Sequence, residues 1–343
     1  MKRKIGRLAA AMVAGVALLA GAAVTSTVLA DTSPNQSAGP TPRDAQTAVL
    51  AAFDRYQIVA GDSPVDFWLD LIRNPGLPDK VKDIAVECGN SRYQPLLDRY
   101  TAGKDVPLAE VRQVWRNTTQ PSCGFSTSYE TLFPLVRRIN EKLPAEKKLR
   151  VLACDPPIDW STITGPQGLA PYRDRDAFIA TVIKEQVLAK HRRALMLFGV
   201  RHLTHGQGEG SAVAMYEKTY PNVTFTIAAH DGFAKDNDVL EKRMASWPVP
   251  ALAPMKRTWL GSLDDTYFDR PIAYPAVDAY LYTGPRDHLL RQTISARTVL
   301  DKDYVAELER RATVIHAPPD SLAHPEVIFQ RELESSVLAY DPK

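Results

Sequence analysis

Short apolar runs that alternate with amphipathic segments are the feature that most constrains how this chain can fold. The runs cover residues 56–61, 83–89, 149–155, 194–200, 223–230 and 277–285. Segments 64–74, 175–192 and 211–220, which separate some of these runs, carry apolar residues at helical spacing. Runs that are apolar at nearly every position are typical of strands buried on both faces. The alternation therefore predicts an α/β fold in which helices flank a mainly parallel sheet.

Two regions interrupt this alternation. Between the second run and the third, three consecutive stretches with helical patterning (91–103, 108–119 and 128–143) predict a helical insertion. After Asp231 the pattern loosens: the proline-rich segment 246–261 is expected to run irregularly over the surface, and 301–315 is expected to form a final helix. We therefore expect a single α/β domain over residues 45–343. Its core spans 50–235, and a C-terminal extension spans 236–343.

The N-terminus has the pattern of an export signal. A basic start is followed by an uncharged apolar run over 8–24, and Val28 and Ala30 occupy the −3 and −1 positions of a cleavage site. Residues 1–30 are therefore predicted to be a signal peptide cut after Ala30, which makes the protein periplasmic or extracellular. The alternative is an uncleaved anchor, the one contact with a membrane that the sequence predicts. Residues 31–44, rich in proline and serine, predict a flexible linker.

Charge limits the class of partner. The formal net charge is +2, and removal of the basic leader turns it slightly negative. A nearly neutral chain without a basic block lacks the electrostatic pattern of a nucleic-acid-binding protein. The expected partner is a small-molecule ligand or substrate.

The three cysteines leave several pairings open. Cys88 and Cys154 each lie at the end of an apolar run, so they are predicted to be buried free thiols. A Cys88–Cys154 disulfide is the alternative if the two strands are neighbours, because an exported protein can form disulfides. Cys123 lies between residues typical of a turn, and a catalytic role for this lone thiol is the remaining hypothesis.

Polar residues cluster where the predicted strands end. In a parallel sheet the carboxyl ends of the strands share one edge, and ligands bind there. The candidates at this edge are Asp62, Glu87, Asn90, Arg92, Asp155, Arg201, His202, His205 and His230.

Each candidate also has a structural explanation. Glu87, in an apolar strand, requires either a function or a buried arginine partner. Asp155 can cap a turn, and Asp62 can serve the dipole of the next helix. His202 and His230 can be hydrogen-bonded structural residues, whereas His205 can be solvated in a glycine-rich loop. The charged runs 173–176 and 308–311 are interpreted as solvated helix surface.

Four segments carry a resemblance to known proteins. "YQIVAGD", "DIAVECGNSRYQPLLDRY", "RVLACDPPIDW" and "ALMLFGVRH" follow in this order. They resemble a group of bacterial proteins that is distantly similar to the erythromycin-esterase-like, ChaN-like (haem-binding uptake) and Tiki/TraB superfamily, over about residues 50–315. The superfamily's second Gly-x-x-His motif corresponds to residues 199–202, and its strand-two acid corresponds to Glu87. This chain departs from the superfamily's first motif. Gly61 and Asp62 are followed by Ser63, and Pro64 stands in the position of the histidine.

The resemblance implies three functional hypotheses. Esterase-like members use the two motifs to activate a water, which implies a hydrolase of an ester or related bond in a small molecule. His202 would be its general base, Glu87 or Asp62 would orient this base, and Arg201 or Arg92 would stabilise negative charge.

The alternatives follow from other branches of the same superfamily. ChaN-like members bind haem, and the loss of the first histidine to Pro64 favours a non-catalytic protein that binds haem, through His202 or His205, or another small molecule. Tiki-like members hold a divalent metal for peptide hydrolysis, and a metal-dependent peptidase would draw its ligands from His202, Glu87, Asp62 and His230.

Overall fold

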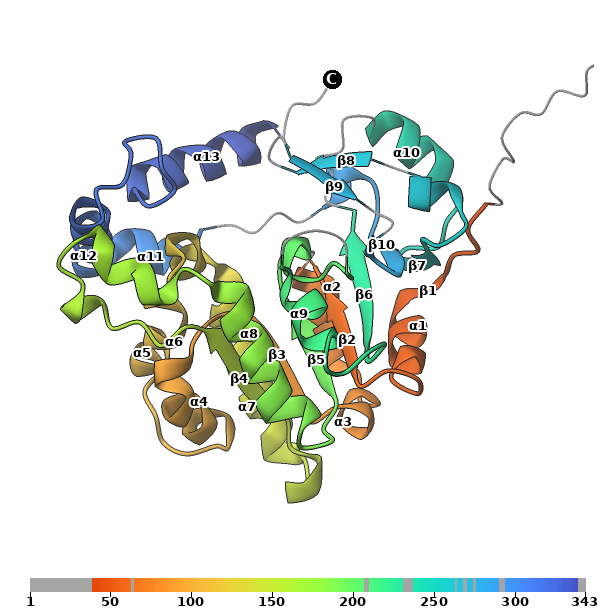
Figure 1. The fold of residues 1–343 in the computed structure, drawn as a ribbon, viewed down its shortest axis with the longest axis horizontal. Coiled ribbons are helices and arrows are strands. Elements are labelled where there is room, and N and C mark those ends of the chain that lie inside the picture. The colour runs from red at the N-terminus through yellow and green to blue at the C-terminus, as the bar shows by residue number, and fades with distance from the viewer. Residues whose placement is uncertain are drawn as a thin grey trace, which may run out of the picture. The chain divides into compact units, whose positions relative to one another are not determined.

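The structure is a computed structural model that describes residues 39–62, 65–206, 210–230, 237–262, 264–267, 270–273, 276–289 and 294–338. Within these residues the chain forms an eight-stranded mixed sheet with helices on both faces (Figure 1), in the order β1-β7-β10-β6-β2-β5-β3-β4. The predicted signal peptide and most of the predicted linker lie outside the described residues. No helix among the described residues is long and apolar enough to cross a membrane.

Six parallel strands form most of the sheet. They are β2 (Ile58–Gly61), β3 (Asp83–Asn90), β4 (Arg150–Asp155), β5 (Ala194–Leu197), β6 (Thr224–Ala229) and β10 (Ala279–Tyr282). The pairs β10–β6, β6–β2, β2–β5, β5–β3 and β3–β4 are all parallel. The predicted α/β class with a mainly parallel sheet is therefore confirmed. Each of these strands coincides with one of the apolar runs.

Antiparallel strands complete one edge and correct the sequence prediction. β7 (Ala251–Pro254) pairs antiparallel with β10 and with the short β1 (Arg43–Asp44). Its first three residues are buried, so the segment predicted to be irregular and superficial is part of the core. The prolines misled the prediction because Pro254 ends the strand and the others precede it. A separate hairpin, β8 (Asp264–Tyr267) and β9 (Arg270–Ala273), was also not predicted.

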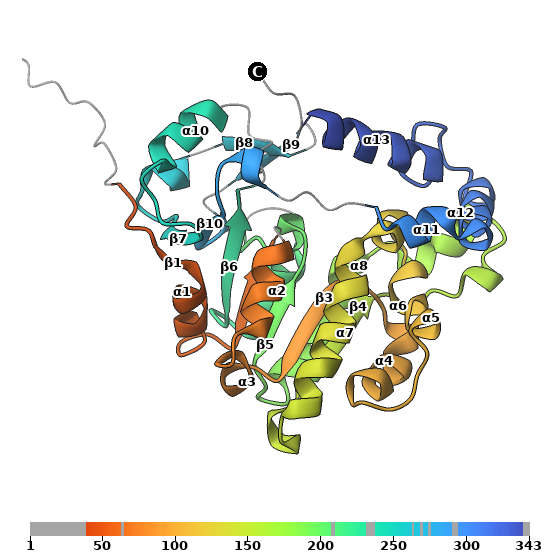
Figure 2. The same cartoon turned by 180° about the vertical axis from the view of Figure 1, so that it is seen from behind.

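One face of the sheet is covered by the N-terminal helices, as seen from behind in Figure 2. They are α1 (Ala45–Ala52), α2 (Val65–Arg73), α3 (Leu77–Lys80), α4 (Gln94–Thr101), α5 (Leu108–Val111), α6 (Gln113–Arg116) and α7 (Thr127–Lys142). Trp68, Trp115 and Phe133 fill the core on this side. A Cβ at Gly61 would collide with the Trp68 ring, so the close packing of α2 on β2 requires glycine there.

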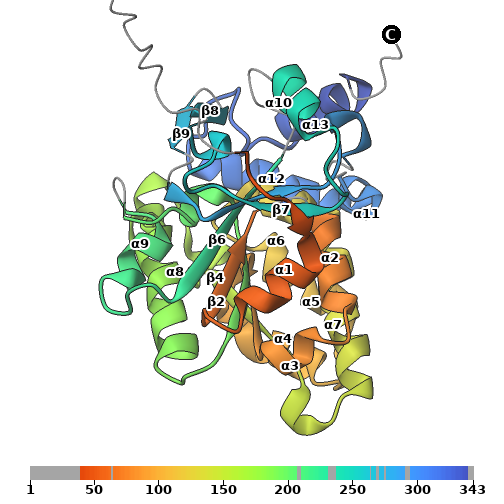
Figure 3. The ribbon, with the colours of Figure 1, turned by 90° about the vertical axis from the view of Figure 1, so that its right-hand side faces the viewer.

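The opposite face is covered by α8 (Arg175–Ile183), which continues into a π-helical turn at Lys184–Leu188, and by α9 (Ala212–Glu217). The remaining helices are α10 (Asn237–Met244), α11 (Ala296–Leu300), α12 (Lys302–Val314) and α13 (Pro325–Leu338). Figures 1 and 3 show these C-terminal segments at the end of the sheet where the parallel strands finish. This is the edge at which the sequence predicts a site.

Candidate functional site

Five charged or ionisable side chains meet where β3, β4 and β5 end. Glu87 belongs to β3, and Asp155 is the last residue of β4. Arg175 and Asp176 begin α8, and His202 ends the 3₁₀ turn Val200–His202 that follows β5. We call these five residues the Arg175 network. The strand-end rule predicted three of them and missed Arg175 and Asp176.

Arg175 lies between two carboxylates. Its Nε donates to Asp155 Oδ1 at 3.0 Å, and one terminal nitrogen donates to Glu87 Oε1 at 3.2 Å. The Asp155 side chain is 0% exposed and that of Arg175 only 14%, so both lie in a medium of low dielectric constant. The interpretation of residues 173–176 as solvated surface is therefore wrong for Arg175. The alternative in which Glu87 pairs with a buried arginine describes what the structure shows.

His202 is held at one nitrogen and less closely at the other. Its Nδ1 donates to Asp176 Oδ1 at 2.8 Å, and the same oxygen accepts the backbone N–H of Ala212 at 2.7 Å. Its Nε2 lies 3.4 Å from Glu87 Oε1 and 3.5 Å from a terminal nitrogen of Arg175. These two distances exceed those of good hydrogen bonds, so Nε2 is the more available nitrogen.

The network sets the charge states of its members. Burial disfavours the charged form of Glu87, but the neighbouring His202 imidazolium, followed by the charge of Arg175, lowers the pKa of Glu87 to about 2. Burial also disfavours imidazolium at His202, but Asp176 and Glu87 raise the pKa of His202 to about 9. At neutral pH the network therefore holds an ionised Glu87 beside a protonated His202.

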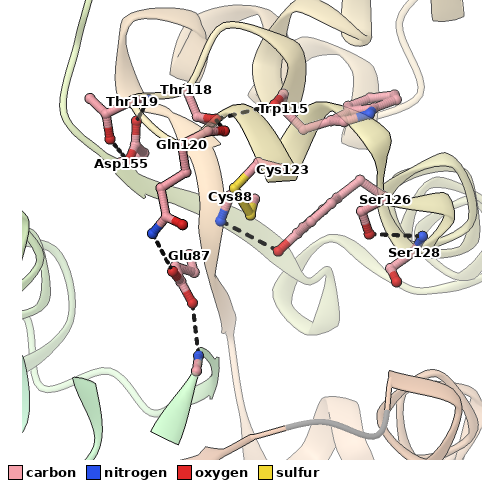
Figure 4. Close-up of a disulfide and its surroundings, with 12 residues drawn as sticks. Glu87, Cys88, Trp115, Thr118, Thr119, Gln120, Cys123, Ser126, Ser128 and Asp155 are labelled. Atoms are coloured by element: carbon pink, nitrogen blue, oxygen red, sulfur yellow. Dashed lines mark hydrogen bonds between the residues drawn. A yellow bond between two sulfur atoms is a disulfide. The ribbon is translucent and has the colours of Figure 1, made fainter. Parts of the chain in front are cut away.

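A loop at residues 117–120 donates further hydrogen bonds to the carboxylates of Asp155 and Glu87 (Figure 4). Thr119 donates its backbone N–H to Asp155 Oδ2 at 2.6 Å and its hydroxyl to Asp155 Oδ1 at 2.7 Å. Gln120 Nε2 donates to Glu87 Oε1 at 2.9 Å. Outside the loop, the backbone N–H of Gly199 donates to Glu87 Oε2 at 2.8 Å. The loop thus fixes the orientation of the acids that face Arg175.

A disulfide between Cys88 and Cys123 fastens this loop to β3, with the two Cα atoms 5.4 Å apart (Figure 4). This pairing overturns three sequence hypotheses: the free thiol at Cys88, the Cys88–Cys154 bridge and the catalytic thiol at Cys123. Cys154 packs among the apolar residues on the α8 side of the sheet, whereas Cys88 bonds to the 3₁₀ segment Pro121–Phe125. Only Cys154 is the buried free thiol that was predicted, and burial raises the pKa of that thiol.

Removing this disulfide is expected to lower the free energy of unfolding by about 3–4 kcal/mol, because the bridge closes a long loop with a sequence separation of 35. The measurement is urea unfolding of the protein with and without reductant, with thiol titration to confirm reduction. The Cys88→Ser/Cys123→Ser double variant is the control, because its stability should not respond to reductant. An unchanged unfolding midpoint in fully reduced wild-type protein would contradict the prediction.

Six of the nine predicted site residues lie outside the network, and the first three are Asn90, Arg92 and Arg201. Asn90 is buried, and its Nδ2 donates to the carbonyl oxygens of Asn117 at 2.6 Å and Ile158 at 2.8 Å, so it ties loops together. Arg92 forms a half-exposed ion pair with Asp159 at 2.9 Å. Arg201 is exposed. The arginine that contacts the site acids Glu87 and Asp155 is Arg175.

The other two histidines each hold a separate part of the fold. His205 lies between Glu217 Oε2 at 2.7 Å and Asp278 Oδ2 at 2.9 Å, and these acids raise its pKa to about 9 against the effect of burial. His205 is therefore ion-paired rather than simply solvated. His230 is buried and contacts the Tyr280 hydroxyl at 2.9 Å and Glu241 Oε1 at 3.0 Å. In both histidines, protein groups occupy both ring nitrogens.

Asp62 follows β2, which lies between β5 and β6. Its backbone N–H donates to the carbonyl oxygen of Ile227 at 3.2 Å, and its own carbonyl oxygen accepts the Trp68 indole N–H at 2.5 Å. These bonds fix the main chain as it leaves the sheet. The other two residues of the segment compared with the first motif, Ser63 and Pro64, lie outside the described residues.

The three histidines predicted as ligands, His202, His205 and His230, do not fit a haem iron or a divalent metal in the described structure. Both ring nitrogens of His205 and His230 are hydrogen-bonded to protein groups. At His202, the positively charged guanidinium of Arg175 lies beside Nε2 and would repel a metal cation bound to that nitrogen. In the part of the chain that the structure describes, no three His, Cys, Asp or Glu side chains are grouped so as to hold a metal ion.

Comparison with known proteins adds little to this description. No family model matches the sequence. No curated protein matches it either. A crystal structure of a protein from Bacillus cereus resembles the chain with a TM-score of 0.48 and 9% identity, covering 72% of this chain and 95% of that one. The type III effector HopBA1 gives a TM-score of 0.42 and 10% identity, covering 73% and 99%. Neither likeness carries a functional argument.

Proposed function

We propose that this protein is a hydrolase of an ester or related bond in a small molecule, with the Arg175 network as its active site. One observation carries the proposal: Asp176 holds His202 Nδ1 at 2.8 Å, while Nε2 is less closely held beside Glu87 and Arg175. A carboxylate on one imidazole nitrogen fixes the tautomer and leaves the other nitrogen for proton transfer, as in other hydrolases.

The neighbouring charges suit the steps of hydrolysis. His202 Nε2 takes a proton from water, the hydroxide oxygen bonds to the carbonyl carbon, and Arg175 stabilises the negative charge that develops on the carbonyl oxygen. Nε2 then returns the proton to the departing alkoxide as the ester bond breaks. Glu87, which is ionised, stabilises the imidazolium in between. This assignment gives the orienting role to Asp176 rather than to Glu87 or Asp62.

The proposal predicts an alkaline pH optimum. Because the pKa of His202 is about 9, most of the protein at neutral pH carries imidazolium, which cannot act as a base. The value of kcat/KM should rise about tenfold per pH unit below this pKa and level off above it. The measurement is a pH profile with the best substrate from a panel of chromogenic aryl and alkyl esters.

Two outcomes would contradict the base assignment: no hydrolysis of any ester in the panel, or a rate that falls as pH rises through 9. Thermal melting must accompany the profile because the same pKa affects folding. The pKa of His202 is raised from its ordinary 6.5 to about 9, so the stability that its ion pairs contribute is complete below 6.5 and is lost as pH rises through 9.

A second candidate is a protein on the same fold that binds a small molecule without turnover. Pro64 favours it, because proline replaces a histidine that the resembled families use. Export also remains part of the proposal, and the Cys88–Cys123 disulfide supports it, because such bonds persist in oxidising compartments.

A further inference from the structure

A pocket of about 410 Å³ lies between the 3₁₀ turns Ser91–Tyr93 and Trp160–Thr162, α6 and α12, and none of its lining residues belongs to the Arg175 network. Arg116, Trp160, Tyr304 and Arg311 are buried residues of its lining, and Gln113 and Asp303 are exposed ones. The sequence interpretation of 308–311 as solvated surface is therefore wrong for Arg311. The volume lies within the range of small-molecule sites.

One buried donor in this lining lacks an acceptor. Arg116 is 7% exposed, and one terminal nitrogen donates to Asp301 Oδ2 at 2.5 Å. Its Nε, also buried, has no hydrogen-bond partner among the described residues. Because this atom is closed off from solvent, the hydrogen bonds that the pocket can offer a ligand come from the other polar groups of its lining.

The charges of the lining select against ionic ligands. Four carboxylates and two guanidinium groups line the pocket, which disfavours an anion. Three of those carboxylates already pair with arginines: Asp159 with Arg92, Asp301 with Arg116, and Glu307 with Arg311.

Two aromatic rings of the lining, to which a cationic ligand could bind, are already covered by arginine side chains. Cations bind over aromatic faces, but the guanidinium of Arg116 lies 4.4 Å from the centre of the Tyr304 ring. That of Arg311 lies 4.9 Å from the centre of the Trp160 ring. These two features together favour a neutral, polar ligand.

The remaining polar groups offer both donors and acceptors. Asn117 Nδ2 donates to the Tyr93 hydroxyl at 2.9 Å and to Gln113 Oε1 at 2.5 Å. Tyr93 therefore keeps its own hydrogen to donate, and Gln113 keeps its NH₂ group. Asp303, exposed in the first turn of α12, adds acceptors. Hydroxyl groups both donate and accept, so they match this mixture.

We propose that this pocket binds a neutral, hydroxyl-rich small molecule of the size of a monosaccharide. The inference does not depend on the catalytic role of His202. Saturation-transfer NMR of the purified protein with D-glucose, N-acetyl-D-glucosamine and myo-inositol tests it, with acetate and tetramethylammonium as anionic and cationic probes.

At least one neutral probe should receive saturation, and the signal should fall several-fold in Gln113→Ala and in Asp303→Asn. Asp320→Asn, an exposed change of the same chemistry outside the pocket, should leave the signal unchanged, and melting curves verify that the variants fold. The proposal is overturned if no neutral probe receives saturation, if both pocket variants keep the full signal, or if acetate or tetramethylammonium binds in preference.

Discussion

The His202→Gln variant is expected to lower kcat/KM for ester hydrolysis by about 10²–10⁴-fold, the usual contribution of general-base catalysis. Glutamine keeps a polar side chain of similar reach, but it cannot accept and return a proton. The variant removes the imidazolium that pairs with Asp176 and Glu87 but keeps a polar side chain between them, so the fold should survive with reduced stability. The measurement is steady-state kinetics at the optimal pH, with melting curves to show that the variant is folded.

His288→Gln is the matched control, because His288 is exposed in the 3₁₀ turn Arg286–His288 and contributes nothing to the Arg175 network. Its kinetics should equal those of the unmodified protein. A folded His202→Gln protein that turns over esters at the original rate would remove His202 from the mechanism. Binding without turnover in both proteins would favour the second candidate.

The Arg175→Met variant is expected to lose about 3–5 kcal/mol of stability, because it leaves the carboxylates of Glu87 and Asp155 in a buried place without their cation. Methionine preserves much of the side-chain volume, so the loss reports charge rather than packing. The measurement is the free energy of unfolding in urea at neutral pH. Arg173→Met changes an exposed arginine of the same segment and should cost little.

A double-mutant cycle separates this effect from a general weakening of α8. In the Arg175→Met/Glu87→Gln double variant, one of the two carboxylates left without a cation is also removed. The double variant should therefore lose less stability than the sum of the losses in the two single variants. If the losses simply add, Arg175 and Glu87 are not energetically coupled, and the network is not the electrostatic unit described above.

Much of the sheet was predictable because burial on both faces leaves a local signature. A parallel strand covered by helices must be apolar along its whole length, and the runs at β2, β3, β4, β5, β6 and β10 show this directly. β7 was missed because its apolar residues are few and lie among prolines, which are local signals of loops. Its place in the sheet comes from pairing with β10, a distant segment.

The site was predictable only in part, for a related reason. The strand-end rule identifies an edge, and Glu87, Asp155 and His202 do meet there. It does not say which way each side chain points or which helix brings its partners. Arg175 and Asp176 lie in a charged stretch that resembles any solvated helix start, and their function as partners depends on how α8 packs beside β4.

The strand order also determines when the central strands of the sheet can pair during synthesis. β3 and β4 can pair early, but Ile58 of β2 is flanked by Ala194 of β5 and Thr224 of β6, which the ribosome makes far later. The centre of the sheet must therefore wait until most of the chain has emerged. Contacts of such long sequence separation form slowly. A nascent chain interrupted before β5 would thus expose apolar strands without partners and would depend on chaperones until translation resumed.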